Sequence, residues 1–161
     1  MYTLDVWEEN MVVAFCGHAD YMKKDEDKRR ILALLEDVVG EQPCEFFLGE
    51  YGRFDSLAYE CARIFQKTHS EAKLVFITPY LLPAYRKNKD ASESHRFDLT
   101  LYPNLEKVPP RYAISHRNRW IVEQADVLIA YVDHKYGGAY TMYRCAVAKK
   151  KAIYNLADKE L

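Results

Sequence analysis

Phe46-Phe47-Leu48-Gly49-Glu50-Tyr51-Gly52-Arg53-Phe54-Asp55 is the stretch that decides the fold. Large apolar residues run into two glycines, and an arginine and an aspartate precede a segment with helical spacing. This order is typical of a buried strand, a tight turn and the start of a helix. Glycine allows backbone angles that a side chain forbids, and it lets a ligand approach the main chain closely. We interpret this turn as one wall of a nucleotide-type site.

Two features of the turn favour an anionic ligand. Free N–H groups at the start of a helix attract negative charge, and the helix dipole adds to that preference. Arg53 offers a forked cation to a phosphate or carboxylate. The alternative is a plain corner in which Arg53 is solvated and Asp55 caps the helix. The stretch has neither the complete dinucleotide fingerprint nor the lysine of a P-loop, so it does not specify the ligand.

Apolar runs and helical patterns alternate along most of the chain. Strands are predicted at 11–17, 45–48, 73–79, 97–101, 126–132 and 152–156. Helices are predicted at 24–39, at 55–68, at 115–125 with Ser115 as its cap, and in a last long segment that begins within 133–140. This alternation predicts a doubly wound, Rossmann-like α/β fold, with a mostly parallel sheet and helices on both faces. We expect residues 1–161 to form a single domain.

The segment from Tyr80 to Arg96 is the least regular part of the chain. It is long and polar, and it contains several aromatic residues. Long irregular loops in compact domains are often lids or binding loops, and they are also often simple surface excursions. The pattern leaves both interpretations open.

Composition limits the class of protein. The 161 residues have a formal net charge of −1, so no global basic field exists and a polynucleotide partner is disfavoured. The N-terminal segment Met1 to Asn10 does not read as a signal peptide, and no apolar run is long enough to cross a membrane. We expect a cytoplasmic protein with reduced, buried thiols at Cys16, Cys44, Cys61 and Cys145.

A parallel sheet of this kind binds ligands outside the carboxyl ends of its strands. The loops expected at that edge are Gly17-His18, Gly49 to Asp55, Thr78 to Tyr80 and Asp133 to Tyr140. The candidate ligand-binding residues are Gly17, His18, Gly49, Gly52, Arg53, Asp55, Arg117, Gly137 and Gly138.

Three individual points accompany this set. His18 either donates to a phosphate or carries a proton at the site, or it is an ordinary hydrogen-bonded surface or core residue. Arg117 and Arg119 lie two apart, so only one of them can face the site. His69, His95, His116 and His134 have no ligand spacing, so we expect no metal; no cofactor is expected, and the catalytic residues, if any, are not identified.

Several motifs together resemble the SLOG superfamily, a Rossmann-like group related to the LOG and DprA/SMF proteins. The motifs are Val13-Ala14-Phe15-Cys16-Gly17-His18, Gly49 to Asp55, His116 to Trp120, Ala125 to Tyr131, Gly137-Gly138-Ala139 and Ile153 to Ala157. The branch that this chain most resembles is that of the short bacterial proteins related to YpsA. The resemblance implies a fold that binds nucleotides or nucleotide-derived ligands, sometimes as a sensor, and it implies a homodimer.

The LOG branch hydrolyses the N-glycosidic bond of nucleoside monophosphates, and this chain departs from its signature. Arg117 lies in a position similar to that of the branch's helix arginine, and Gly137, Gly138 and Thr141 match the glycine-rich signature. Tyr140 replaces the third glycine, and Arg144 stands where the glutamate is expected. A glycosidase needs a carboxylate near the developing sugar cation. Glu50, Asp55 and Asp133 are the available substitutes, and nothing in the sequence selects one.

Three functions remain open. The first is binding of a nucleotide or nucleotide-derived small molecule, as a sensor or binding protein. The second is an N-glycosidic-bond hydrolase or base-exchanging transferase acting on nucleotides. The third is an interaction module with a vestigial pocket, in which the 13 tyrosines serve a protein surface.

Overall fold

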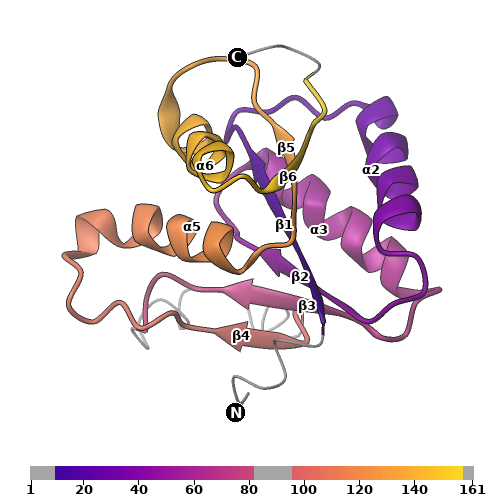
Figure 1. Cartoon of the computed structure of the whole chain (residues 1–161), viewed down its shortest axis with the longest axis horizontal. Coiled ribbons are helices and arrows are strands. Elements are labelled where there is room, and N and C mark those ends of the chain that lie inside the picture. Colours follow the sequence, from indigo (N-terminus) through magenta and orange to yellow (C-terminus); the bar gives the residue numbers. More distant parts are fainter. Residues whose placement is uncertain (1–9, 82–95, 158–161) are drawn as a thin grey trace.

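One parallel sheet carries the fold (Figure 1). The structure is a computed structural model, and it describes residues 10–81 and 96–157. Its strands are β1 (Met11–Gly17), β2 (Cys44–Leu48), β3 (Ala72–Ile77), β4 (Leu99–Leu101), β5 (Val127–Tyr131) and β6 (Ala152–Asn155). They form a six-stranded sheet in the order β4-β3-β2-β1-β5-β6, and every neighbouring pair is parallel. The predicted doubly wound α/β fold is confirmed.

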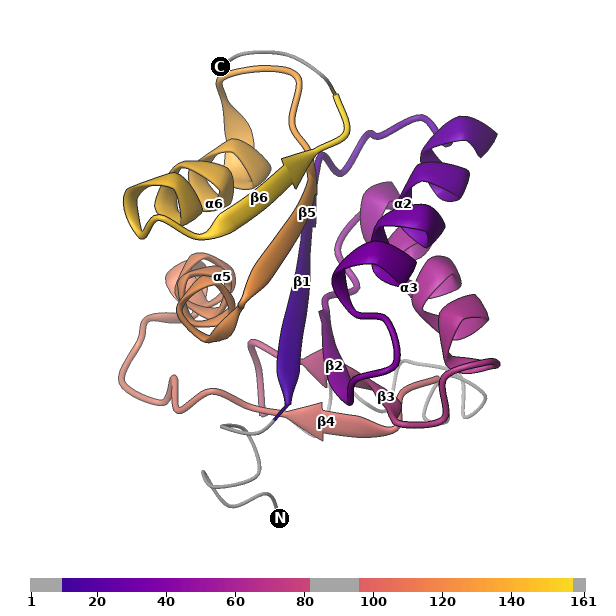
Figure 2. The same ribbon diagram turned by 45° about the vertical axis from the view of Figure 1, so that its right-hand side comes forward.

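Helices cover both faces of this sheet, as the turned view shows (Figure 2). On one face lie α2 (Asp25–Val38) and α3 (Arg53–Gln66), and on the other lie α5 (Ala113–Gln124) and α6 (Gly137–Ala148). Each face therefore has its own core. Phe46, Phe54 and Phe65 belong to one cluster, and Phe47 and Ile121 to the other.

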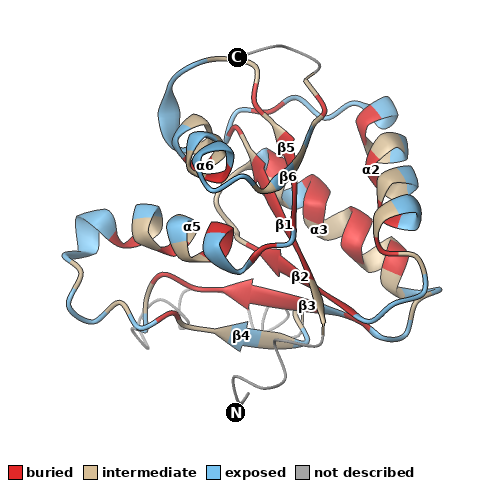
Figure 3. Ribbon diagram, viewed as in Figure 1, coloured by how far each residue is buried: buried red, intermediate tan, exposed pale blue. Residues whose placement is uncertain are grey.

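The central strand is buried on both faces, which explains its sequence. The interior residues of β1, from Val12 to Cys16, are all buried, and β2 is buried throughout (Figure 3). A continuous apolar run is what such a strand requires, because both alternating sets of side chains meet a helical layer. The prediction of 11–17 as a strand is therefore confirmed to the residue.

The strand order reverses at β1. This strand pairs with β2 on one side and with β5 on the other, and Gly17 pairs with Tyr131 at the carboxyl end. The chain leaves β1 toward α2 on one face, and it leaves β5 toward α6 on the opposite face. Loops that diverge in this way leave a crevice between them at the carboxyl edge.

Two predicted helix caps are wrong. Helix α3 begins at Arg53, with Gly52 as its N-cap at φ +138°, so Asp55 lies inside the first turn. Helix α5 begins at Ala113, because a 3-10 turn at Pro110–Tyr112 leads directly into it. Ser115 lies within this helix and donates its hydroxyl hydrogen bond back to the Tyr112 carbonyl at 3.0 Å.

The edge strands are less buried than the centre. The alternation predicted for a half-exposed strand is present in β4, where Thr100 is exposed and its two neighbours are partly buried. The loop predicted at 80–96 falls mostly on 82–95, which lie outside the described residues, as do residues 1–9. Within the described ranges, no helix has the length and apolar character needed to cross a membrane.

Candidate functional site

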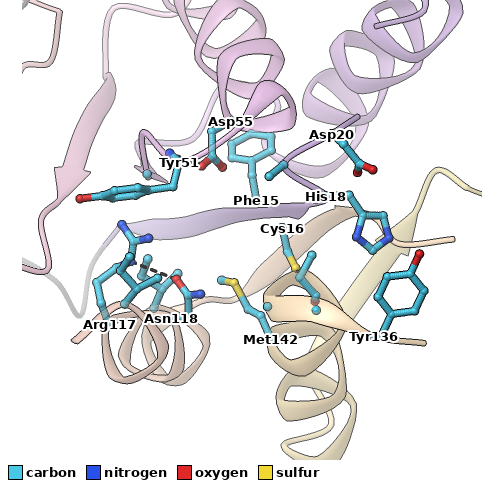
Figure 4. A pocket seen from close by; sticks show the side chains of 18 of the residues that line it. Phe15, Cys16, His18, Asp20, Tyr51, Asp55, Arg117, Asn118, Tyr136 and Met142 are labelled. Atoms are coloured by element: carbon cyan, nitrogen blue, oxygen red, sulfur yellow. Dashed lines mark hydrogen bonds between the residues drawn. The ribbon is translucent and has the colours of Figure 1, made fainter. Parts of the chain in front are cut away.

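A cavity of about 350 Å³ opens at the carboxyl ends of β1, β2 and β5 (Figure 4). Most of the predicted ligand-binding residues lie on its wall: Gly17, His18, Gly49, Asp55, Arg117, Gly137 and Gly138. Gly52 and Arg53 do not line it. Arg53 instead faces a separate surface hollow, where a guanidinium nitrogen lies 3.5 Å from the Met22 sulfur.

The predicted loop after β3 also lies away from the cavity wall. Thr78 is buried, and its hydroxyl donates to the Tyr80 carbonyl at 2.9 Å. Residues 78–80 are not among those that line the cavity. The site is therefore built from the loops after β1, β2 and β5, together with the facing side of α5.

Arg117 forms one end of the cavity from helix α5. Its side chain is only 3% exposed, and Nη1 donates to the Ile77 carbonyl at 2.7 Å. Nε donates to the Asn118 amide oxygen at 3.0 Å, and the guanidinium lies 5.3 Å from the centre of the Tyr51 ring. Arg119 is exposed. The two arginines thus divide as their spacing predicts, and Arg117 is the one that faces inward.

Asp55 lies beside this arginine at the start of α3. Its carboxylate accepts the Tyr51 N–H at 2.9 Å. Burial raises the pKa of Asp55, while the Tyr51 N–H and the charge of Arg117 act in the opposite direction. A side chain on Gly49 would place its Cβ 3.1 Å from Arg117 and 3.3 Å from Asp55. Gly49 therefore gives these two polar side chains room to lie next to the main chain.

Two stacked imidazoles form the other end of the cavity. His18 is 6% exposed, and its ring lies 3.5 Å from that of His134 at an angle of 11°. The Asp133 N–H donates to His18 Nε2 at 3.1 Å, and Tyr136 packs against His134 with ring centres 4.0 Å apart. Burial and the neighbouring His134 lower the pKa of His18, against the raising effect of Asp133 and Asp20. This favours a neutral His18.

The start of α6 lies next to the imidazoles and is open. A Cβ on Gly137 or Gly138 would meet nothing within 4 Å. No side chain caps this helix, and its first turn contains no acidic residue. The N–H groups of its first turn are therefore available to an anion in the cavity.

Apolar side chains line the middle of the cavity, between its two polar ends. Phe15, Cys16 and Met142 lie there (Figure 4). Cys16 is not a reactive thiol, because burial raises its pKa far above the usual range and its Sγ donates to the Ala139 carbonyl at 3.1 Å. All four cysteines are free, and Cys145 alone is only partly buried.

Comparison with known proteins shows which fold this is. No family profile matches the chain, and no curated protein matches it in sequence. Several solved structures match in fold, and three of them illustrate the likeness. DNA processing protein A from Helicobacter pylori, described for its single-stranded DNA binding mode, has a TM-score of 0.60 at 14% identity, over 94% of this chain and 67% of that one.

The second structure is the molybdenum cofactor carrier protein of Chlamydomonas reinhardtii, with a TM-score of 0.58 at 13% identity, over 92% of this chain and 77% of that one. The third is DNA processing protein A of Streptococcus pneumoniae, with a TM-score of 0.62 at 15% identity. It covers 97% of this chain, which spans about half of that protein's length (54%). The chain has the fold of these proteins.

Among the residues of the cavity wall that sequence reasoning missed are Tyr51, Asn118 and His134. Tyr51 and Asn118 are neighbours of predicted residues, and their contacts with Arg117 are visible only in three dimensions. His134 had no partner at ligand spacing along the chain, because its partner His18 follows a different strand. The signal that could have found it is its place directly after β5, beside the loop of β1 at the point of reversal.

Proposed function

We propose that this protein binds a nucleotide or a nucleotide-derived small molecule in the cavity at the carboxyl edge of its sheet. The supporting observation is the pairing of an uncapped, open helix start with a buried arginine across one cavity. A volume of about 350 Å³ lies within the range of about 300–1,000 Å³ that small-molecule sites occupy.

The anionic group of the ligand binds at the start of α6. No side chain caps its first turn, and a Cβ on Gly137 or Gly138 would meet nothing within 4 Å. The start of α3 is a poorer anion site, because Asp55 already places a carboxyl group in its first turn. A phosphate therefore prefers α6, and the rest of the ligand extends over the apolar middle toward Arg117 and Asn118.

Calorimetry against a panel of mono-, di- and cyclic nucleotides and nucleotide sugars tests this proposal. The panel includes a single-stranded oligonucleotide, because one structure of the same fold is described as binding single-stranded DNA. Arg117→Met is expected to weaken binding by at least about tenfold, since it removes a charge-assisted donor worth about 1.5–3 kcal/mol. Arg119→Met, an exposed arginine on the same helix, is the matched control and leaves affinity unchanged.

A second pair of variants tests where the phosphate binds. Gly138→Asp introduces a carboxylate in the first turn of α6, which favours the helix and repels an anion. Gly138→Asn has the same size without the charge. Gly138→Asp is expected to bind at least about tenfold more weakly than Gly138→Asn at low salt. Equal affinities of these two variants, or silence across the whole panel, would overturn the proposal.

A second candidate function rests on Asp55. Of the three carboxylates that could replace the missing glutamate of the LOG signature, Asp55 alone lines the cavity. Its raised pKa suits a group that carries a proton to a leaving group. Cleavage of an N-glycosidic bond would then release the free base, which chromatography detects. No release from nucleoside monophosphates at high protein concentration, or equal release by Asp55→Asn, would eliminate this candidate.

A further inference from the structure

Three potential metal ligands converge where the loops after β1 and β5 meet. They are His18, Asp133 and His134, and their ligand atoms all lie within 4.8 Å of one another. One oxygen of the Asp133 carboxylate lies near a nitrogen of each ring, 3.3 Å from His18 Nε2 and 2.7 Å from His134 Nδ1. Two imidazoles and one carboxylate are a ligand set that divalent transition metals prefer.

The main chain holds this cluster firmly. The side-chain amide of Asn155 forms two hydrogen bonds with the main chain of Val132, the residue before Asp133. Its oxygen accepts the Val132 N–H at 3.0 Å, and its nitrogen donates to the Val132 carbonyl at 2.9 Å. On the other side, His18 is buried at the end of the central strand. The positions of His18 and Asp133 are therefore fixed by the sheet rather than by a free loop.

We propose that His18, Asp133 and His134 bind one divalent transition-metal ion of the zinc class. Tetrahedral ligands at about 2.0–2.1 Å from zinc lie about 3.3 Å from each other. The His18–Asp133 separation of 3.3 Å already matches this value, whereas the His134–Asp133 separation of 2.7 Å has to lengthen when the ion binds. Three protein ligands leave the fourth position to water or to an anion. Both histidines line the cavity, so that position opens toward the ligand proposed above.

Charge around the cluster also favours a cation. Asp133 belongs to the cluster, and Asp20 lies on the wall of the same cavity as the two histidines. These carboxylates add negative charge to this end of the site. A bound metal ion would offset this charge. The metal site goes beyond the proposed function, because metal binding requires no nucleotide.

Binding requires one ring to turn, and it requires His18 Nε2 to release the Asp133 N–H that it accepts at 3.1 Å. Lone pairs of imidazole lie in the ring plane, and the two rings are stacked at 11°, so their nitrogens do not both point at one ion while the stack persists. His134 is the ring that can move, because it is 27% exposed and the following Gly137 and Gly138 are uncrowded. Metal binding is therefore expected to break the stack of His18 and His134.

His69 provides a matched control elsewhere in the molecule. It also lies near two carboxylates, 3.4 Å from Glu36 and 3.7 Å from Glu41. Its ring is stacked on Phe65 at 3.7 Å, and its Nδ1 lies 2.9 Å from the Phe65 carbonyl. This cluster has one imidazole where the proposed site has two, so we expect no transition-metal site there.

Titration of tag-free, EDTA-treated protein with Co²⁺, followed by displacement with Zn²⁺, tests the proposal. Visible absorption of Co²⁺ is expected to saturate at one equivalent. His134→Ala and Asp133→Asn should each weaken binding by more than about tenfold, whereas His69→Gln leaves it unchanged. Circular dichroism checks that each variant folds, and His18→Gln serves as a third variant if either of the first two does not.

Nuclear magnetic resonance of the imidazole ring protons supplies a second readout. Saturation with diamagnetic Zn²⁺ should shift the ring protons of His18 and His134 together and leave those of His69 in place. Absence of saturable Co²⁺ binding would overturn the proposal. It would also be overturned if His69→Gln lost as much affinity as His134→Ala, or if Zn²⁺ left both cavity histidines unshifted.

Discussion

Glycines lie at the starts of two helices that line the cavity, α3 and α6, yet the two corners differ in what surrounds them. At the start of α3, Gly17 and Gly52 are pressed against the protein itself: a Cβ on Gly17 would lie 2.2 Å from the Phe54 ring, and one on Gly52 would lie 2.7 Å from Ala19 Cα. At the start of α6, a Cβ on Gly137 or Gly138 would meet nothing within 4 Å. The same residue type therefore serves close packing at one corner and leaves open space at the other.

The two corners also differ in charge. The first turn of α3 contains Asp55, and the Arg53 N–H already donates to the Ala19 carbonyl at 3.1 Å. The first turn of α6 contains no acidic residue and no capping side chain. A glycine-rich corner is thus an anion site only when its N–H groups are free and no protein atoms fill the space beside it. Of these two corners, only the start of α6 has both properties. Four substitutions can break or sharpen this comparison.

Gly17→Ala is expected to have the largest effect. The new methyl group would overlap the ring and Cβ of Phe54, which is fully buried in α3 and cannot swing away. We expect a loss of about 3 kcal/mol in the free energy of unfolding, or roughly 6–12 °C in Tm. Urea denaturation measures it. A loss below about 1 kcal/mol would mean that this corner is not closely packed.

Gly52→Ala is expected to cost about 2 kcal/mol, because it adds backbone strain at φ +138° to a contact with the main chain of Ala19. Gly40→Ala is the matched control. Gly40 also has a positive φ, +58°, but a Cβ added there would lie 3.7 Å from its nearest neighbouring atom, so we expect a cost of about 1 kcal/mol. Thermal unfolding of both variants separates crowding from backbone strain, and equal costs would remove crowding as the cause.

Asp55→Asn is expected to change how stability depends on pH. The folded pKa of Asp55 is raised above the ordinary value of 3.8, so the folded state holds this proton more tightly than the unfolded state does. Its contribution to stability is therefore present at low pH and is lost as pH rises from about 3.8 through the folded pKa.

Asparagine does not ionise, so Asp55→Asn lacks this pH-dependent loss of stability. Relative to the wild type, Asp55→Asn should gain stability as pH rises above about 3.8, as measured by urea denaturation from acidic to neutral pH. If Asp55→Asn instead loses stability relative to the wild type over this range, then Arg117 and the Tyr51 N–H, rather than burial, dominate the environment of this carboxyl group.

Gly138→Ala is expected to have the smallest effect, and one of opposite sign. Alanine is the better helix former, and the new methyl group would enter empty space. We expect an increase of about 0.5 kcal/mol in the free energy of unfolding, measured by thermal denaturation. A decrease of 1 kcal/mol or more, on the order of an overpacking cost, would contradict the open corner.

The fold was predictable because its signals are local. The continuous apolar run of β1 and the stripe of α3 identify their elements without knowledge of any other part of the chain. The start of α3 was placed two residues late, since Asp55 is a good cap by type, while the true N-cap, Gly52, depends on an unusual φ. Cap positions are set by backbone geometry that residue preferences describe only on average.

The site was predictable in location and less so in detail. Parallel strands bring their carboxyl ends to one edge, so Gly17, Gly49 and Gly137 could be assigned to the same cavity from topology alone. Which glycine faces space and which faces Phe54 or Ala19 depends on packing between distant segments. The same holds for His18 and His134, whose contact follows from the pairing of β1 with β5.

The order of the strands has a consequence for the chain as it is made. The Val12 N–H binds the Asp126 carboxylate, 114 positions later, and one whole side of β1 pairs only with β5. Until that segment has left the ribosome, β1 exposes the unpaired edge of a long apolar strand, which is a template for aggregation. We therefore expect the nascent chain to be most prone to aggregation while β1, a central strand of the finished sheet, has no β5 to pair with.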